Sequence, residues 1–240
     1  MKKLLMVMGL ISMGMSEPIL QFYCGATMAK SMRVLSDKFE TQENVKVNII
    51  KGGSGKLYKK ILLKKDADLF LPGSDAYIKQ DTNNLFSHKR LIGYNKPVLL
   101  VQKGNPKNIK SLDDFENPKI RIVLGAKNSG SVGKITKKIL TTFKGEDFYE
   151  KIYNKALKAP TSIEIIQALK DNKADVSINW KATVYMDDNE NYVDYENIPY
   201  IAPKRPLYLV VVKYSQHPKL AKKFVDFIFK NKKYLKSKGF

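Results

Sequence analysis

The sequence predicts an α/β fold in which mainly parallel sheets are flanked by helices. Two observations lead to this prediction. Strand-like apolar runs alternate along the chain with segments whose apolar residues recur every three to four positions, as on one face of a helix. In addition, glycine-containing loops join strand to helix after residues 19–23, 45–50 and 120–124. Such alternation favours parallel sheets that are covered on both faces.

The most informative of these loops is Lys51–Lys56, with the sequence KGGSGK. It follows the β-branched run 45–50 and precedes a helical pattern through Leu57, Ile61 and Leu62. Glycines let backbone N–H groups approach a ligand closely, and a helix that begins there offers unpaired N–H groups and the positive end of its dipole. The loop is therefore a candidate anion site, although similar loops also serve as plain turns.

Two further loops belong to the same predicted sheet. The strand 19–23 ends at Cys24–Thr27, where Thr27 either caps the next helix or contacts a ligand. The short strand 68–71 ends at Pro72–Asp75, where Ser74 has the same two interpretations. Because the carboxyl ends of parallel strands share one edge, we expect the loops 24–27, 52–55 and 72–75 on one rim, where ligands bind.

The second half of the chain predicts a second αβ unit. A long strand begins at residue 97, and a later strand runs into the loop 125–133, which opens a helix. Thr161 and Ser162 are placed to cap another helix, and the strand 175–180 ends at the only tryptophan.

Residues 198–203 look like a return to the first unit. We therefore predict two lobes joined by two crossover strands. Residues 17–97 and 204–240 form the first, discontinuous lobe, and residues 98–203 form the second.

The N-terminus predicts export. Lys2 and Lys3 precede the apolar run Leu4–Met13, and Gly14–Ser16 supplies small residues for a cut after Ser16. This pattern is typical of a secretory signal peptide, residues 1–16, and is too short for a membrane span. We expect the mature protein in the periplasm, with no internal disulfide because Cys24 is the only cysteine.

The net charge of +20 first suggests nucleic acid as a partner. However, only four of the 43 basic residues are arginine, whose bidentate guanidinium is the usual reader of bases and phosphates. The lysines are spread along the chain, mostly on polar helix faces. We therefore expect a solvated basic surface that attracts anions in general, and no nucleic-acid partner.

The segments that could be catalytic or metal-binding motifs do not have the residues or the spacing that those motifs require. The KGGSGK loop does not fit a nucleotide-binding P-loop, because Leu57 follows its lysine and no glycine stands at the required spacing. The two histidines, His88 and His217, have no partner at metal-ligand spacing. With no base near a nucleophile, we expect a protein that is not an enzyme and holds no metal or cofactor.

The order of motifs resembles the molybdate-binding family of periplasmic solute-binding proteins along essentially the whole mature chain. The resemblance rests on six segments: Gly25–Thr27, Gly52–Gly55, residues 66–75 (DADLFLPGSD), Ala174–Trp180, Ile198–Pro203 and Tyr234–Phe240. It implies a two-lobed type II periplasmic binding fold that closes around an oxyanion such as molybdate or tungstate. It also implies delivery to the permease and ATPase of an ABC transporter in the inner membrane, by a protein expected to be monomeric.

The resemblance also implies which residues hold the ligand. The first lobe contributes hydroxyls and N–H groups at the first two loops, and the second lobe contributes backbone donors and a tyrosine hydroxyl, at the position of Trp180 here. The expected ligand-binding residues are Gly25, Ala26, Thr27, Gly53, Ser54, Gly55, Ser74, Ser131, Val132, Gly133, Ser162, Trp180 and Lys181. For Trp180 a plain core position, and for Lys181 a solvent position, remain alternatives.

This sequence departs from the family pattern in its first loop, Gly25–Thr27, in the tryptophan, and in the lysines at 56, 127 and 181. Molybdate-type sites favour neutral donors, so a lysine at the site would indicate a larger or more highly charged anion. A phosphorylated or carboxylated organic anion, phosphate or sulfate therefore remains an alternative ligand. A surface adhesin or sensor subunit that reuses the fold is an alternative role.

Overall fold

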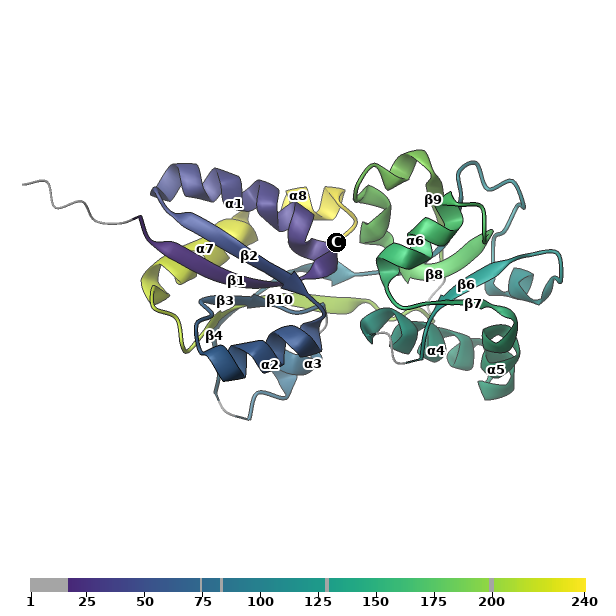
Figure 1. The fold of residues 1–240 in the computed structure, drawn as a ribbon, viewed down its shortest axis with the longest axis horizontal. Coiled ribbons are helices and arrows are strands. Elements are labelled where there is room, and N and C mark those ends of the chain that lie inside the picture. Colours follow the sequence, from purple (N-terminus) through teal and green to yellow (C-terminus); the bar gives the residue numbers. More distant parts are fainter. Residues whose placement is uncertain (1–16, 74, 83, 128–129, 199–200) are drawn as a thin grey trace, which may run out of the picture.

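The computed structural model describes residues 17–73, 75–82, 84–127, 130–198 and 201–240. Figure 1 shows two lobes side by side, each built around one sheet with helices on both faces. The predicted signal peptide, residues 1–16, lies outside the described residues, as does Ser74. Within the described ranges, no helix is long and apolar enough to cross a membrane.

The first lobe contains a sheet with the strand order β2–β1–β3–β10–β4. Strand β1 pairs in parallel with β2 and with β3, whereas β10 is antiparallel to both β3 and β4. Four strands therefore run in one direction and β10 runs against them. The strands are β1 (Ile19–Gly25), β2 (Lys46–Gly52), β3 (Leu69–Leu71), β4 (Phe86–Asn95) and β10 (Arg205–Val212).

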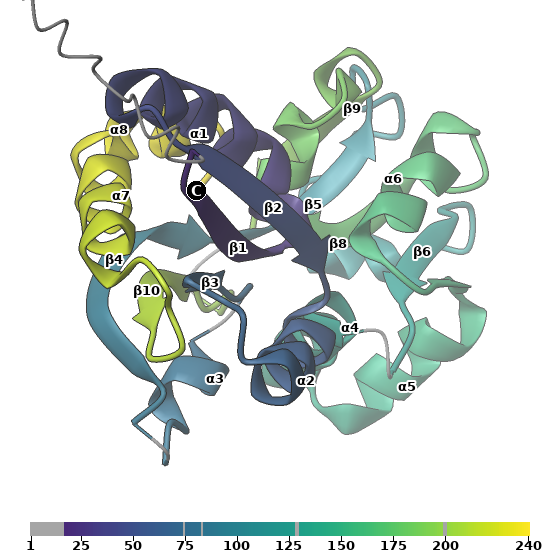
Figure 2. The same cartoon turned by 60° about the vertical axis from the view of Figure 1, so that its left-hand side comes forward.

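Helices cover both faces of this sheet (Figure 2). One face carries α1 (Ala29–Glu43), entered through the 3₁₀ turn η1 (Ala26–Met28), with α7 (Pro218–Lys230) and α8 (Lys232–Ser237); the other carries α2 (Ser54–Lys64) and α3 (Ala76–Lys79).

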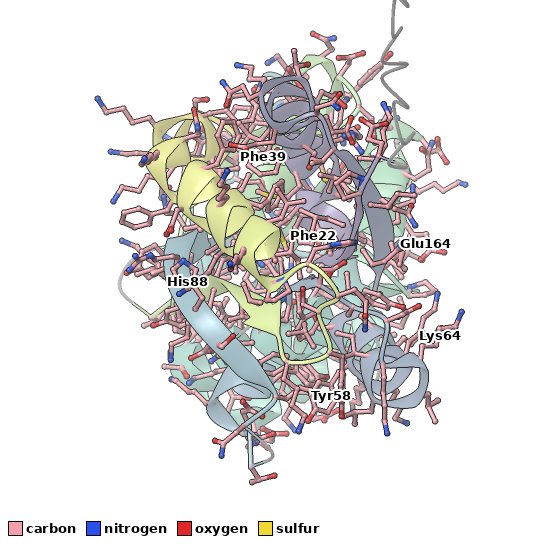
Figure 3. All side chains as sticks on the ribbon, turned by 90° about the vertical axis from the view of Figure 1, so that its left-hand side faces the viewer. Phe22, Phe39, Tyr58, Lys64, His88 and Glu164 are labelled. Atoms are coloured by element: carbon pink, nitrogen blue, oxygen red, sulfur yellow. The ribbon has the colours of Figure 1, made fainter. Side chains whose placement is uncertain are left out.

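The core under α1 and α7 is aromatic. The ring of Phe224 meets the rings of Phe22 and Phe39 edge-on, with centroids 5.5 and 5.0 Å apart. Figure 3 looks onto this lobe: Phe22 and Phe39 lie beside α7, while Tyr58 lies toward the opposite side of the sheet. Phe39 belongs to the buried face of α1 with Met32 and Leu35, which is the face that the helical spacing predicts.

The second lobe repeats this arrangement with the strand order β7–β6–β8–β5–β9. Strand β6 pairs in parallel with β7 and β8, and β5 is antiparallel to both β8 and β9. The strands are β5 (Pro97–Gln102), β6 (Ile122–Gly125), β7 (Leu157–Ala159), β8 (Val176–Trp180) and β9 (Val193–Asn197).

Helices again lie on both faces of the second sheet. One face packs against α4 (Gly130–Lys144) and α5 (Glu146–Lys155), and the other against α6 (Ser162–Lys170). The connections contain the short 3₁₀ segments η2 (Leu112–Glu116), η3 (Lys181–Tyr185) and η4 (Asn189–Asn191).

The predicted sheets are mainly parallel, and the observed ones are mixed: four of the five described strands of each sheet share a direction. The reversed strands are β5 and β10, which are the two that arrive from the other lobe. A strand that enters a sheet at its carboxyl rim has to run against its neighbours, so the reversal follows from the crossovers.

Both crossovers join the carboxyl rims of the sheets. Strand β4 ends at Asn95 and β5 begins two residues later at Pro97, which lies opposite Trp180 at the end of β8. The return connection runs from Asn197 to Arg205, which lies opposite Asn95. The carboxyl rims of the two sheets therefore face each other, and in Figure 1 the parallel strands β1 and β2 run toward the second lobe.

The lobes also touch away from the crossovers. The ammonium of Lys30 on α1 lies 3.1 Å from a carboxylate oxygen of Asp187. At the C-terminus, Gly239 packs so closely on η3 that a Cβ there would lie 3.0 Å from the backbone of Ala182. Its φ of +85° also favours glycine.

One buried aspartate stands before the central strand of each sheet. Asp68 accepts hydrogen bonds from the N–H of Gln21 at 2.7 Å and the hydroxyl of Ser215 at 2.6 Å. Asp175 accepts from the N–H of Arg121 at 2.8 Å and from its guanidinium at 2.6 Å. Each carboxylate thus ties the start of a central strand to the neighbouring strand.

We predict that Asp175→Asn destabilises the protein at neutral pH. Burial raises the pKa of Asp175, but the hydrogen bonds and charge of Arg121 outweigh it and leave the pKa lowered. A lowered pKa in the folded state adds stability above the unfolded pKa of about 3.9, and this stability is lost as the pH falls through the folded value. Urea unfolding should show a loss of about 1–3 kcal/mol at pH 7 that shrinks below about pH 4.

The matched control is Asp171→Asn, since Asp171 forms an exposed pair with Lys173. Exposed pairs contribute little, so its unfolding midpoint should not move. An equal loss for Asp175→Asn at pH 7 and pH 3 would contradict the proposed role of its charge.

Candidate functional site

Three loops of the first lobe meet at the rim of its sheet. Gly25 at the end of β1 pairs with Gly52 at the end of β2. The N–H of Gly73, after β3, donates to the hydroxyl oxygen of Ser54 at 2.8 Å. A Cβ on Gly25 would lie 3.3 Å from the nitrogen of Gly73 and 2.6 Å from the Met28 side chain. The strand order therefore brings the predicted loops together, except that Ser74 lies outside the described residues.

The start of α2 has the features of an anion site. Its first hydrogen bond runs from the N–H of Leu57 to the carbonyl of Gly53 at 3.0 Å, so the N–H groups of Ser54, Gly55 and Lys56 have no partner within the helix. No described side chain caps this end. The Ser54 oxygen accepts from Gly73, and its hydroxyl proton remains available for another acceptor. Gly53 is exposed, and a Cβ there would meet nothing within 4 Å.

Thr27 lies in η1, in the first of these loops. Gly25 occupies the N-cap position of η1 and Met28 that of α1, and no described side chain caps either one. The alternative interpretation of Thr27 as a helix cap is therefore not seen. Thr27 is half-buried and its neighbour Ala26 is exposed, beside the loop that carries Ser54.

Asn95 is a residue at this rim that the sequence interpretation missed. Its amide nitrogen donates to the carbonyl of Gly73 at 2.9 Å, and its side-chain oxygen is buried without a hydrogen-bond partner among the described residues. Asn95 thus connects the loop after β3 to the first residue of the crossover. The available signal is a polar residue at the end of a strand, directly before Lys96 and Pro97.

The second lobe brings its own loops together. A Cβ on Gly125, at the end of β6, would lie 2.8 Å from the nitrogen of Gly133. The N–H of Ala126 donates to the carbonyl of Ala159 at 3.0 Å. Ser131 is exposed, and the side chain of Val132 is buried. The start of α4 therefore presses directly on the rim of the second sheet.

Ser162 is the first residue of α6, and some polar groups at that end of the helix already have hydrogen-bond partners within the protein. The hydroxyl of Thr161 accepts from the N–H of Glu164 at 3.3 Å, which confirms the predicted cap. The carbonyl of Ser162 accepts from the amide of Asn179 at 2.9 Å, which fixes the helix to the end of β8. Ser162 also lines a cavity of about 110 Å³ with Thr183 of η3.

The side chains of Trp180, Lys127 and Lys181 make contacts within the protein. Trp180 is 1% exposed and packs in the core beneath α4 and α5, so the core alternative describes its side chain. The ammonium of Lys127 pairs with Glu150 at 2.9 Å. The ammonium of Lys181 lies 4.3 Å from the centre of the Tyr195 ring on β9. Lys127 is therefore not left as a counter-charge between the loops, whereas Lys181 has no carboxylate partner among the described ion pairs.

Redox and metal chemistry find little support here. Cys24 is fully buried, and burial raises the pKa of its thiol well above the ordinary value. The thiolate, which is the reactive form, is therefore disfavoured. Among the described residues, no three histidine, cysteine or carboxylate side chains gather as a metal site. The described parts of the rim loops offer N–H and O–H groups for hydrogen bonding.

A family model for bacterial extracellular solute-binding proteins matches residues 20–240, and the chain belongs to this family. A relative in Haemophilus influenzae, which its name describes only as a binding protein, is 24% identical over 248 residues. That match covers 100% of this chain and 98% of the relative.

Solved structures share the fold. The sulfate-binding protein SubI of Mycobacterium tuberculosis has a TM-score of 0.78 and 20% identity, covering 93% of this chain and 86% of that one. The periplasmic molybdate-binding protein of Azotobacter vinelandii has a TM-score of 0.74 and 14% identity, covering 92% and 97%. Peb3 of Campylobacter jejuni has a TM-score of 0.73 and 22% identity, covering 92% and 98%, and PEB3 has been solved with L-phospholactate bound.

We predict opposite outcomes for adding one methyl group at two glycines of the site. Gly125→Ala should lower the free energy of unfolding by about 1–3 kcal/mol, because its Cβ meets the backbone of α4. Gly53→Ala should leave stability near that of the wild type, since its Cβ enters open space. Urea unfolding of the two variants checks this, and equal losses at both positions would contradict the close packing of α4 on β6.

Proposed function

We propose that this solute-binding protein captures a small tetrahedral oxyanion, of the molybdate or tungstate type, between the facing rims of its two lobes. The observation that carries the proposal is the start of α2. There, three first-turn N–H groups, the Ser54 hydroxyl and an exposed Gly53 stand together on the rim that faces the second lobe. These are neutral donors, and a helix N-terminus stabilises a negative charge without carrying one itself.

The second lobe supplies the complementary donors. The first turn of α4, at Ser131, Val132 and Gly133, and the first residue of α6, Ser162, lie at the rim of the second sheet. An oxyanion between the rims would exchange its hydration shell for N–H and O–H groups from both lobes. Selectivity would then follow from the number of donors and the space between them.

The nature of the donors favours a compact oxyanion over an organic one. Lys127 is neutralised by Glu150, so it is not left as a dedicated counter-charge for a carboxylate or phosphate tail. The alternative ligand is a phosphorylated or carboxylated organic acid, and the fold shared with PEB3, solved with L-phospholactate, supports it.

The role that fits this site is transport by recognition alone. Binding would close the lobes about the two crossovers, at Asn95–Pro97 and at residues 198–204, and so bury the anion. The closed protein, a monomer in the periplasm, would then be read by the permease and ATPase of an ABC importer. The proposal assigns no catalytic step to any residue.

Calorimetry of the protein without residues 1–16 tests the ligand class. Molybdate and tungstate should bind most tightly, sulfate and phosphate more weakly, and phosphoglycolate or citrate most weakly, because the donors at the rim are neutral. Tightest binding of an organic acid would replace the oxyanion proposal with its alternative. Absence of heat with every anion would overturn both.

Gly53→Asp tests the place of binding. The new carboxylate would stand in open space beside the first turn of α2, where it should repel an oxyanion and lower its affinity at least about 100-fold. Gly53→Asn is the matched control, because it has the same shape without the charge and should retain affinity within about tenfold. Equal affinity of the two variants would place the anion elsewhere.

A further inference from the structure

Four lysines converge where the two crossovers meet, on segments that lie far apart in the sequence. Lys96 is the single residue between β4 and β5, and Lys204 directly precedes β10. Lys181 is the first residue of η3 in the second lobe, and Lys236 lies on α8 in the first lobe. We call these residues the hinge lysines.

Hydrogen bonds and packing bring these segments together. The N–H of Lys181 donates to the carbonyl of Lys96 at 2.7 Å. Arg205, next to Lys204, lies opposite Asn95, next to Lys96. The C-terminal end of α8 is fixed by contacts of Phe240 with Gly93 on β4 and of Gly239 with η3. Burial and the positive charges of the other three hinge lysines lower the pKa of Lys96.

The hinge lysines are not neutralised by the protein. Every Asp and Glu of the chain belongs to the described part, and none of the ion pairs found there involves Lys96, Lys181, Lys204 or Lys236. Elsewhere on this basic protein lysines do find carboxylates, as Lys127, Lys144 and Lys223 do. Gathering four cations without an anion is unfavourable, particularly when Lys96 is partly buried.

A phenol completes the cluster. The ammonium of Lys181 lies 4.3 Å from the centre of the Tyr195 ring, and the hydroxyl groups of Tyr185 and Tyr195 interact with each other. A hydrogen bond from Lys181, with the charges of Lys181 and Lys96, outweighs burial and lowers the pKa of Tyr195. The positive potential of the hinge lysines thus acts on a neighbouring group that is itself uncharged, as it would act on an external anion.

We propose that the hinge lysines, at the crossovers, form a second anion site that takes a compact multivalent oxyanion such as a pyrophosphate or phosphate group. Ammonium groups bind such anions as point charges, so several lysines suit a concentrated charge better than a single extended one. The neutral donors of the rim and the cations of the hinge would therefore select different anions.

Because of the position of this site, a bound anion would affect how the two lobes are arranged. Two hinge lysines stand on the crossovers, one on the first lobe and one on the second, so a bound anion attracts both lobes at once. It stabilises the lobe arrangement that gathers the four ammonium groups, and its absence leaves them to repel each other. Occupancy thereby biases the movement of the lobes, on which capture at the rim depends.

The experiment uses inorganic pyrophosphate at low ionic strength and the Gly53→Asp protein, so that any binding at the rim is suppressed. Calorimetry should show one pyrophosphate per chain. Lys96→Met together with Lys236→Met should weaken it at least about tenfold, because two charge-assisted contacts are lost. Lys219→Met together with Lys233→Met is the control: both residues are exposed, lie on the neighbouring helices α7 and α8, and change the net charge equally.

Thermal unfolding provides a second readout. Pyrophosphate should raise the melting temperature of the control pair and not that of the hinge pair. Without anion, the hinge pair should melt no lower than the control, since removing two repelling cations does not destabilise the fold. No pyrophosphate binding by Gly53→Asp, or equal weakening by both pairs, would overturn the proposal. If Gly53→Asp leaves molybdate binding intact, the rim proposal fails while the hinge result can still be read.

Discussion

The connection of the two sheets through their carboxyl rims is the constraint on which the rest of this structure depends. Only one residue separates the end of β4 from the start of β5, and the returning strand β10 pairs with β4 beside that crossover. The loops at the ends of the parallel strands must therefore face each other. These loops carry the uncapped start of α2 and the glycines that allow close approach. Had either crossover left from the amino end of a sheet, the same loops would point away from one another and could not form the proposed shared site.

A buried aspartate stabilises the start of the central strand in each of the two lobes, although the sequence shows no repeat. Asp68 and Asp175 are both buried, both follow alanine, and both bind the N–H of a residue at the start of the neighbouring strand. Their partners differ: Asp68 is satisfied by Ser215 and backbone, and Asp175 by Arg121. A pattern of two residues is too short to stand out in a sequence, so the correspondence becomes visible only when the strands are paired.

The features that the sequence predicted are those with local causes. Strand–glycine–helix joints, the spacing of Met32, Leu35 and Phe39, and the Thr161 cap all depend on neighbours along the chain. The features that it left open or missed depend on partners far away. Trp180 is a core residue because α4 and α5 cover it. Lys127 forms an ion pair with Glu150, and the side chain of Asn95 donates a hydrogen bond to the carbonyl of Gly73. The reversed direction of β5 and β10 likewise follows from the crossovers and not from the residues of those strands.

The architecture puts neutral donors and cationic groups in different places, so the net charge of +20 does not act equally at the rim and at the hinge. The rim offers fixed dipoles, which are screened weakly because they act at contact distance, whereas the hinge lysines act through net charge, which salt screens over about 10 Å at 0.1 M. An anion held at the rim should therefore depend on shape and donor number, and an anion held at the hinge on valence and ionic strength. If the lobes close about the hinge as proposed, the protein would respond to the identity of the anion at the rim and to the concentration of the anion at the hinge.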